Sequence, residues 1–255
     1  MIVKILNAFQ DNYIYVVILD HSDCVVVDPG ESSRILEFLK ENGLVLNSIL
    51  LTHHHHDHVA GISALVKEYP KVKVFGSVYD AEMDRIPHQT EFLSGGDKFS
   101  LLGNDFSVLS SPGHTLGHIC YLLIDKSSSQ RHWFVGDTVF GAGCGRVFEG
   151  SYKQMYHSLE DLRKSLQADD LLWSAHEYTK SNLEIFLKLD KTNTKLSSEH
   201  KRLQRKLCTM PLLASHEMKI NPFFNCDKEE YQNIFKTYGK SLETFIELRK
   251  FRDKF

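Results

Sequence analysis

Residues 52–58 read THHHHDH and place five imidazoles and one carboxylate directly after an apolar run. Neutral imidazole and carboxylate are the ligands that zinc and similar divalent cations take in proteins. Residues two apart on an α-helix lie about 200° apart around its axis, so His53, His55 and Asp57 could not share a helical face. In an extended or turning segment they can converge. His53, His55, Asp57 and His58 then offer two pairs of ligands, enough to begin two adjacent metal sites.

Two other interpretations of this run stay open at the level of the sequence. A histidine run can bind metal adventitiously, as a purification tag does, although this run is internal rather than terminal. His54, His56 and His58 also share the i, i+2 spacing and could be ligands in a second register. Asp57 favours the first register because it adds a carboxylate to the pattern.

Short apolar runs separated by small or polar residues predict strands joined by turns over the first two thirds of the chain. Several of these runs are followed at once by a further candidate ligand: His114, Asp137 or His176. If the strands are neighbours, their ends bring the ligands to one edge of the sheets, where loops carry function on a rigid scaffold. The expected strands are residues 14–19, 24–27, 72–75, 106–109, 119–124, 133–135 and 171–173, with helices at 32–42 and 62–69.

Strand patterns fade after Glu177, and the remaining apolar residues are spaced as in helices. The segments expected to be helical are residues 180–189, 197–208, 228–238 and 241–252. We therefore predict two domains: an α/β sandwich over residues 1–175 and a small α-helical domain over residues 176–255.

Composition limits the classes of protein that the chain can represent. The 255 residues carry a formal net charge of -3 without long charged blocks, which argues against a dedicated nucleic-acid binder. The five cysteines are odd in number and include no C-x-x-C pair, so neither a disulfide framework nor a thiolate zinc site is expected. The chain shows no signal peptide and no run of membrane-spanning length. These features predict a cytoplasmic protein that does not enter membranes.

The carboxyl-terminal end is an exception to the mixed charge pattern. Basic residues are interleaved with phenylalanines over the last sixteen positions, and the set includes Arg249 and Arg252. A solvated helix face and a site for an anionic ligand both fit this pattern.

Taken together and in this order, the segments THHHHDH, SPGHTLGH, VGDT and AHEYT resemble the metallo-β-lactamase superfamily. The segments GAGCGRVFEG and LRKFRDKF extend the resemblance, over essentially the whole length, to the glyoxalase II family, the hydroxyacylglutathione hydrolases. The fold that the resemblance implies is an α/β structure: an αββα sandwich followed by a small C-terminal α-helical domain.

Transferred position by position, the resemblance implies two divalent metal ions, with zinc as the first expectation and iron or manganese as alternatives. Asp28 and His118 occupy similar motifs and are expected to support the ligands through hydrogen bonds. The implied ligands are His53, His55 and His114 on the first metal, Asp57, His58 and His176 on the second, and Asp137 bridging both.

The implied reaction is hydrolysis of S-(2-hydroxyacyl)glutathione, typically S-D-lactoylglutathione, to glutathione and D-lactate, the second step of methylglyoxal detoxification. A hydroxide that bridges the metals would attack the thioester, and Asp57 would orient it. A thiol ionises near pH 8.5, so a thiolate leaves without strong general-acid help. Cys144 is then not needed as a nucleophile, and we expect it to have a structural role in packing or in a turn of the backbone. We expect a monomer.

The resemblance also assigns a set of substrate-binding residues. Glutathione carries two carboxylates, and arginine offers a planar fork that suits them. Phe148 stands where some members of the family have tyrosine, and Arg252 stands where lysine is common. The residues expected to contact glutathione are Arg146, Phe148, Tyr178, Arg249 and Arg252.

Three other functions remain to be distinguished. A glutathione persulfide dioxygenase would share the superfamily but use one iron, and the complete second ligand set weighs against it. A nuclease of the superfamily fits poorly with the acidic charge balance. A non-catalytic protein of the same fold that binds metal or glutathione is the alternative from outside the enzymes.

Overall fold

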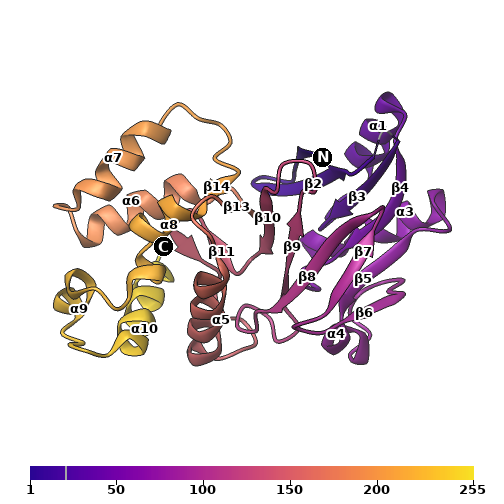
Figure 1. The fold of residues 1–255 in the computed structure, drawn as a ribbon. Coiled ribbons are helices and arrows are strands. Elements are labelled where there is room, and N and C mark those ends of the chain that lie inside the picture. Colours follow the sequence, from indigo (N-terminus) through magenta and orange to yellow (C-terminus); the bar gives the residue numbers. More distant parts are fainter. Residues whose placement is uncertain (21) are drawn as a thin grey trace.

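Two six-stranded sheets stack on each other, with a helical segment at one end, in the computed structural model, which describes residues 1–20 and 22–255 (Figure 1). The first sheet has the order β1 (Ile2–Ala8), β2 (Asn12–Ile18), β3 (Asp23–Val27), β4 (Val45–Leu50), β5 (Lys73–Ser77) and β6 (Glu91–Leu93). The second has the order β14 (Leu212–Leu213), β13 (Leu171–Ser174), β10 (Arg131–Gly136), β9 (Ile119–Ile124), β8 (Asn104–Ser110) and β7 (Lys98–Leu101). All the strands predicted from the sequence are present.

The first sheet is buried on both faces, which explains why its strands read as nearly continuous apolar runs. In β2, Tyr13 and Tyr15 point into the core between the two sheets, whereas Ile14 and Val16 join a second core on the opposite face. Successive side chains of a strand point to opposite faces, so one strand serves two cores.

Helices cover both outer faces of the pair of sheets. Ile35 of α1 (Ser33–Asn42) and Ile62 of α3 (Ile62–Glu68) pack in the outer core of the first sheet. Leu159 of α5 (Tyr152–Ser165) packs in the core of the second sheet. This arrangement confirms the predicted αββα sandwich. The short helices α2 (His56–Val59) and α4 (Val78–Glu82) and the hairpin of β11 (Val139–Phe140) and β12 (Gly143–Cys144) lie in the connections.

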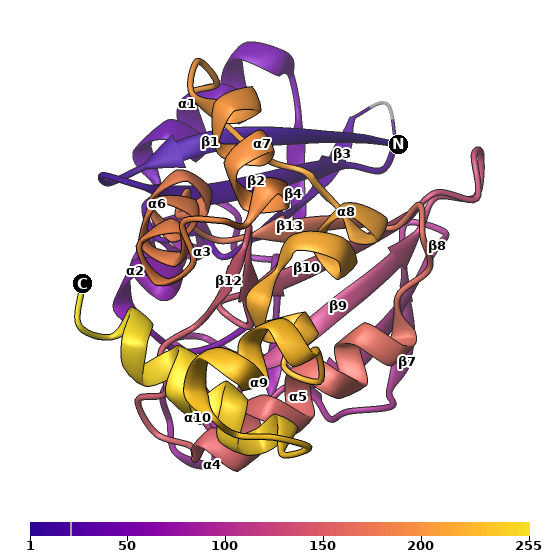
Figure 2. The same ribbon diagram turned by 90° about the vertical axis from the view of Figure 1, so that its left-hand side faces the viewer.

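The C-terminal segment is helical, as expected, and Figure 2 views the molecule from that end. It contains α6 (Thr179–Leu189), α7 (Thr194–Leu203), α8 (Ala214–Ile220), a 3-10 helix (Pro222–Asn225), α9 (Glu229–Phe235) and α10 (Ser241–Arg252). The helices predicted at 197–208 and 228–238 end earlier than expected. The α8 helix and the 3-10 helix were not predicted, because neither is long enough to show a clear helical period.

The helical segment is joined to the sandwich by backbone pairing between strands and by a shared hydrophobic core. β14 pairs with β13 in the second sheet, with Leu212 opposite Leu172, so the expectation that strands end near residue 177 was wrong. Phe223 and Phe245 of the helical segment belong to the same buried cluster as Tyr15 between the sheets. The strand pairing and the shared core attach the helical segment to the edge of the second sheet.

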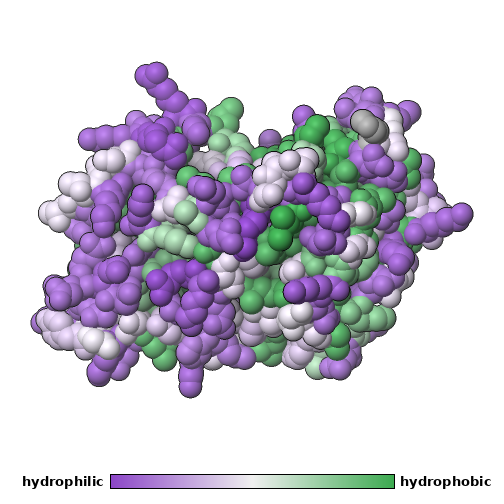
Figure 3. All heavy atoms as spheres, viewed as in Figure 1, coloured by the Kyte–Doolittle hydropathy of each residue, from purple (hydrophilic) through white to green (hydrophobic). Residues whose placement is uncertain are grey.

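In the view of Figure 3, the surface of the helical segment is mostly hydrophilic. Over the sheets, hydrophobic residues are also exposed among the hydrophilic ones. Among the described residues, no helix is both long and apolar enough to cross a membrane.

Candidate functional site

The predicted ligands come from four strand ends that meet at one edge of the sandwich. The histidine run follows β4 of the first sheet, whereas His114, Asp137 and His176 follow β8, β10 and β13 of the second. β8 and β10 are separated by β9, so their ligands do not come from adjacent strands. The ligands meet because the two sheets pack against each other, and not only because neighbouring strands end side by side. The structure brings all seven predicted ligands into one cluster.

The histidine run changes its backbone conformation partway along. His53 and His55 lie in a non-helical stretch, whereas Asp57 and His58 lie in the single turn of α2. Gly30 allows this turn to approach closely, because a Cβ at that position would lie 1.8 Å from the backbone oxygen of Asp57. The turn therefore directs Asp57 and His58 to a different part of the cluster from His53 and His55.

Three histidine nitrogens converge in the first part of the cluster. The Nδ1 atom of His55 lies 3.0 Å from Nε2 of His53 and 2.9 Å from Nε2 of His114. The Nδ1 atom of His114 donates to the backbone oxygen of Arg146 at 2.7 Å, so in the neutral ring Nε2 presents a lone pair to the cluster. Three imidazole nitrogens in this arrangement can hold one cation from one side.

The second part of the cluster contains one carboxylate and two imidazoles. The Oδ2 atom of Asp57 lies 3.5 Å from Nε2 of His58 and 3.4 Å from Nε2 of His176. The other ring nitrogen of each histidine faces a carboxylate: Nδ1 of His58 is 3.1 Å from Asp28 and Nδ1 of His176 is 2.8 Å from Asp11. Such partners fix the ring orientation and make the imidazole a better metal ligand.

Asp137 lies between the two parts. Its Oδ2 atom is 3.3 Å from Nε2 of His114, and its Oδ1 atom is 3.7 Å from Nε2 of His58 and 3.5 Å from Nε2 of His176. Each oxygen thus faces a different half of the cluster, which is the arrangement that a bridging ligand needs. Within the part of the chain that the structure describes, the buried Asp137 Oδ1 and His58 Nε2 atoms have no hydrogen-bond partner. Because buried polar atoms are seldom left without a partner, these atoms fit a site for cations.

The protonation states of the cluster also suit cations. Burial lowers the pKa of His55 to about 4, helped by His114, and burial lowers the pKa of His53 well below its usual value. Burial opposes ionisation of Asp137, but His176, His114 and His58 hold its pKa well below the ordinary range. Burial likewise disfavours a charge on His176, but Asp137 and Asp11 raise its pKa to about 10, so a cation bound there must displace a proton.

The two supporting residues expected from the sequence contact the ligands. Asp28 accepts hydrogen bonds from the backbone amide of Thr52 at 2.8 Å and from its hydroxyl at 2.7 Å, beside His58. His118 accepts a hydrogen bond at 3.1 Å from the backbone amide of Asp137 and stacks against His53.

Asp11 and Asn12 are site residues that the sequence analysis missed. Asn12 donates to Oδ2 of Asp57 at 2.8 Å, and Asp11 contacts His176 as described above. Asp11 lies in the turn between β1 and β2 and Asn12 is the first residue of β2, a place where polar residues are common for reasons of solvation alone. Their only sequence signal is that the polar pair ends an apolar run, as the predicted ligands do.

The two remaining histidines of the run point away from the cluster. His54 faces Asp80 at 3.1 Å and Glu149 at 3.4 Å, and His56 is exposed. The second register, with His54 and His56 as ligands, is therefore wrong.

Replacing His56 with alanine is expected to leave both the metal content and the activity unchanged. The matched variant His58→Ala removes a buried imidazole from the cluster and is expected to lower the metal content. Elemental analysis of the two purified variants measures this difference. Equal metal loss in both variants would contradict the ligand assignment.

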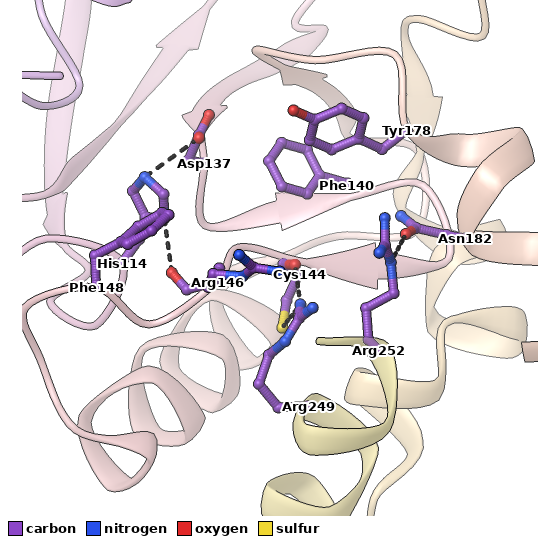
Figure 4. A pocket seen from close by; sticks show the side chains of 10 residues that line it. All are labelled: His114, Asp137, Phe140, Cys144, Arg146, Phe148, Tyr178, Asn182, Arg249 and Arg252. Atoms are coloured by element: carbon purple, nitrogen blue, oxygen red, sulfur yellow. Dashed lines mark hydrogen bonds and ion pairs between the residues drawn. The ribbon is translucent and has the colours of Figure 1, made fainter. Parts of the chain in front are cut away.

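A pocket of about 280 Å³ opens beside the cluster. Figure 4 shows His114 and Asp137 on one side of this pocket and two arginine side chains on the other. All five residues expected to bind the substrate line it. The complete lining is His114, Asp137, Phe140, Cys144, Arg146, Phe148, Tyr178, Asn182, Arg249 and Arg252.

The three arginines differ in how firmly the structure holds them. Arg249 is only 3% exposed, donates to the backbone oxygen of Cys144 at 2.7 Å and pairs with Asp253 at 3.0 Å. Arg252 donates to Oδ1 of Asn182 at 2.7 Å, and burial together with the charges of Arg249 and Arg146 lowers its pKa. Arg146 is half exposed and shares Asp253 with Arg249. Asp253 thus pairs with two of the three guanidinium groups and Arg252 is held by a neutral amide, which leaves this side of the pocket with excess positive charge.

Two aromatic residues connect the pocket with the ligand cluster. The ring of Tyr178 stacks on His176 with centroids 4.8 Å apart and planes at 7°. Phe148 is 61% exposed at the pocket mouth and meets the rings of His55 and His114 edge-on.

Cys144 is held in a packing role, as expected from the sequence. Burial raises the pKa of its thiol to about 11, so the thiolate needed for nucleophilic attack is scarce at neutral pH.

Two models of known protein families together match residues 7–255. The model of the metallo-β-lactamase superfamily matches residues 7–176, and that of the hydroxyacylglutathione hydrolase C-terminus matches residues 177–255. The hydroxyacylglutathione hydrolase of Photobacterium profundum is 39% identical over 99% of this chain and 99% of its own length. That of Aliivibrio salmonicida is 38% identical over the full length of both chains.

Two solved structures with the same fold are more distant in sequence than these relatives. ETHE1 from Myxococcus xanthus has a TM-score of 0.67 at 25% identity and covers 98% of this chain and 90% of its own. A metallo-beta-lactamase from Staphylococcus aureus has a TM-score of 0.68 at 21% identity and covers 99% of this chain and 71% of its own, which shows the fold alone.

Proposed function

This chain belongs to the hydroxyacylglutathione hydrolase family, and residues 7–176 match the metallo-β-lactamase superfamily. We therefore propose that the ligand cluster and the arginine pocket form one active site. The chain is a thioester hydrolase. It cleaves S-(2-hydroxyacyl)glutathione to glutathione and a 2-hydroxy acid, with S-D-lactoylglutathione and D-lactate as the typical pair. The observation that carries this proposal is that His114 and Asp137 of the cluster line the same pocket as the three arginines.

Two divalent cations fit the cluster. His53, His55 and His114 would hold the first, Asp57, His58 and His176 the second, and Asp137 both, because its two oxygens face the two halves. Zinc is the first candidate, with iron or manganese as alternatives. When bound, such cations polarise the carbonyl of the substrate and lower the pKa of water from about 15.7 toward about 7.

The protein's own residues orient the reacting groups. Interaction with His58, Asn12 and His176 outweighs burial and repulsion by Asp137, so the pKa of Asp57 is lowered and its carboxylate stays ionised. The partly exposed carboxylate can therefore accept a hydrogen bond from the attacking water and hold it toward the thioester. The leaving thiolate needs no strong acid, because a thiol ionises near pH 8.5.

The arginine pocket would bind the peptide part of the substrate. Excess positive charge suits the two carboxylates of glutathione, and partly buried guanidinium groups bind carboxylates in a defined geometry. Tyr178 and Phe148 lie between this charge and the cluster, where the chain of the thioester must pass. The acyl group would then face the metal ligands.

The complete second half of the cluster favours hydrolysis over the one-iron dioxygenase. Asp57, His58 and His176 lie within reach of one cation, and a mono-iron enzyme has no use for this set. The non-catalytic alternative differs from a hydrolase only in turnover, so it is decided by experiment.

The test is to purify the protein, count its metals and follow the loss of the thioester from S-D-lactoylglutathione with and without a chelator. We expect two metal ions per chain and turnover that the chelator removes. Absence of turnover by the fully metallated protein would exclude the proposed hydrolysis. One iron per chain, with oxygen consumed in the presence of glutathione persulfide, would favour the dioxygenase.

We further propose a domain boundary at residues 175 and 176, a monomer, and a location in the cytoplasm. The last proposal is supported by the cysteines, all five of which are free in the structure, as a reducing compartment keeps them.

A further inference from the structure

The hairpin of β11 and β12 forms the wall of the pocket between the ligand cluster and the arginines. It begins two residues after Asp137 and ends two residues before Arg146. Phe140 and Cys144, one from each strand, line the pocket. The placement of this hairpin therefore sets how far the metal ligands lie from the guanidinium groups.

Several buried side chains of the helical segment hold the backbone of the hairpin. Asn182 donates to the backbone oxygen of Gly141 at 3.0 Å and Arg249 to that of Cys144, and Glu217 and Asn221 bind the hairpin at its tip. A carboxylate oxygen of Glu217 in α8 accepts a hydrogen bond from the backbone amide of Ala142 at 2.9 Å. The side-chain amide of Asn221 donates to the backbone oxygens of Phe140 at 3.1 Å and Gly143 at 3.0 Å. Glu217 is 1% exposed and Asn221 is fully buried. Because an isolated two-stranded hairpin is only marginally stable, these bonds matter for its position.

The tip of the hairpin has a conformation that needs external support. Ala142 has a φ of 52°, in the left-handed region that residues other than glycine seldom adopt. Its amide is the group that Glu217 binds. Next to it, α6 packs closely, because a Cβ at Gly143 would lie 2.2 Å from the side-chain nitrogen of Asn182. Asn182 also accepts a hydrogen bond from Arg252, so the same side chain contacts both the hairpin and an arginine of the pocket.

We propose that Glu217 and Asn221 are positioning residues, which fix the hairpin so that the metal ligands and the arginines fit one glutathione thioester at the same time. This inference rests on the proposed function for the identity of the ligand. Neither side chain lines the pocket, so neither contacts the substrate and both act through the hairpin.

The environment of Glu217 indicates which variants distinguish its hydrogen bond to the hairpin from the effect of its ionisation. Burial raises the pKa of this carboxyl to about 7, although the bonds from Ala142 and Asn221 oppose the shift. The charged group that adds to the shift is Glu199 of α7, which itself pairs with Arg202 and His216. The folded state holds this proton more tightly than the unfolded chain does, so the stability it contributes is lost as pH rises from 4.5 through about 7.

The experiment compares Glu217→Gln, Glu217→Asp and Glu217→Ala in the full-length metallated protein. Glutamine keeps an oxygen for Ala142, aspartate keeps the carboxyl group but falls short by one methylene, and alanine removes the group. Asp170→Ala is the control, because Asp170 is a buried carboxyl that bonds Trp133 and has no bond to the hairpin. The measurements are KM and kcat for S-D-lactoylglutathione, the Kd for glutathione, metal content and hydrogen exchange at the Ala142 amide.

We expect the alanine and aspartate variants to raise KM and the Kd for glutathione about tenfold, as the loss of one buried hydrogen bond implies. Metal content should stay unchanged, and the Ala142 amide should exchange faster. The glutamine variant should restore the wild-type KM, and between pH 4.5 and about 7 it should lack the loss of stability that Glu217 contributes in the wild type. In folded Asp170→Ala protein, KM should equal that of the wild type.

A wild-type KM and a protected Ala142 amide in folded Glu217→Asp protein would overturn the proposal. So would a KM in Asp170→Ala raised as much as in Glu217→Ala, because general destabilisation would then explain both. A wild type that binds glutathione but does not hydrolyse the thioester would refute the proposed function, while the exchange and Kd measurements still test the role of Glu217.

Discussion

Replacing Asp137 with alanine is expected to remove bound metal and hydrolytic activity together. One oxygen of Asp137 faces His114 and the other faces His58 and His176, so its loss leaves both halves of the cluster without their shared carboxylate. We expect kcat/KM to fall by about a thousandfold or more, which corresponds to about 4 kcal/mol of lost transition-state stabilisation. Elemental analysis and thioester assays on the same preparation measure both effects.

A control for Asp137→Ala must separate metal loss from misfolding. Asp125 is also largely buried, but it bonds Ser127 and Ser128 at a turn and not the cluster. Asp125→Ala should therefore keep its metals and its turnover. Circular dichroism shows whether each variant is folded. A folded Asp137→Ala protein with a full complement of metal would show that Asp137 is not the bridging ligand.

Replacing Arg249 with alanine is expected mainly to raise KM for the thioester. The guanidinium of Arg249 lines the pocket and also holds the backbone oxygen of Cys144, so the variant loses both a positive charge and a support of the hairpin. The loss of charged hydrogen bonds predicts a KM about 10- to 100-fold higher, with a smaller effect on kcat. Steady-state kinetics over a range of substrate concentrations separates the two parameters.

Lys250→Ala is the matched control for this variant. Lys250 is the next residue of α10 and carries the same charge, but it pairs with Glu247 at the surface. Its replacement should leave KM unchanged. If Arg249→Ala lowered kcat alone, binding of the peptide part of the substrate would not be its role. If Lys250→Ala raised KM equally, the charge of the helix end as a whole would be responsible.

The local patterns of the sequence predicted most of the fold, because burial on one or both faces of a strand leaves a clear trace in residue types. β9 has the bounds that were expected, and so does α10. Other elements were missed. The strand β1, with seven residues, and the helix α5, with fourteen, were not among the predictions, and neither were several short elements. β14 has two residues and α8 has seven, and neither is long enough to repeat a pattern.

The site could be predicted where a residue's chemical type was itself unusual. A histidine run broken by one aspartate is unlike ordinary surface sequence, so His53, His55, Asp57 and His58 could be selected before any fold was known. Asp11 and Glu217 could not, because a polar residue in a turn and an acidic residue in a helix are common. Their contacts lie 165 and 75 residues away along the chain.

The sequence by itself determined the chemistry that is available: imidazoles and carboxylates for cations, arginines for an anionic ligand, and strands that end in candidate ligands. Only the tertiary structure decided which atoms meet. It turned His54 toward Asp80, set one oxygen of Asp137 toward each half of the cluster, and buried Arg249 against Cys144. The physical reason is that ligand type is a property of single residues. Orientation depends on two sheets and a helical segment that close on each other through one continuous core.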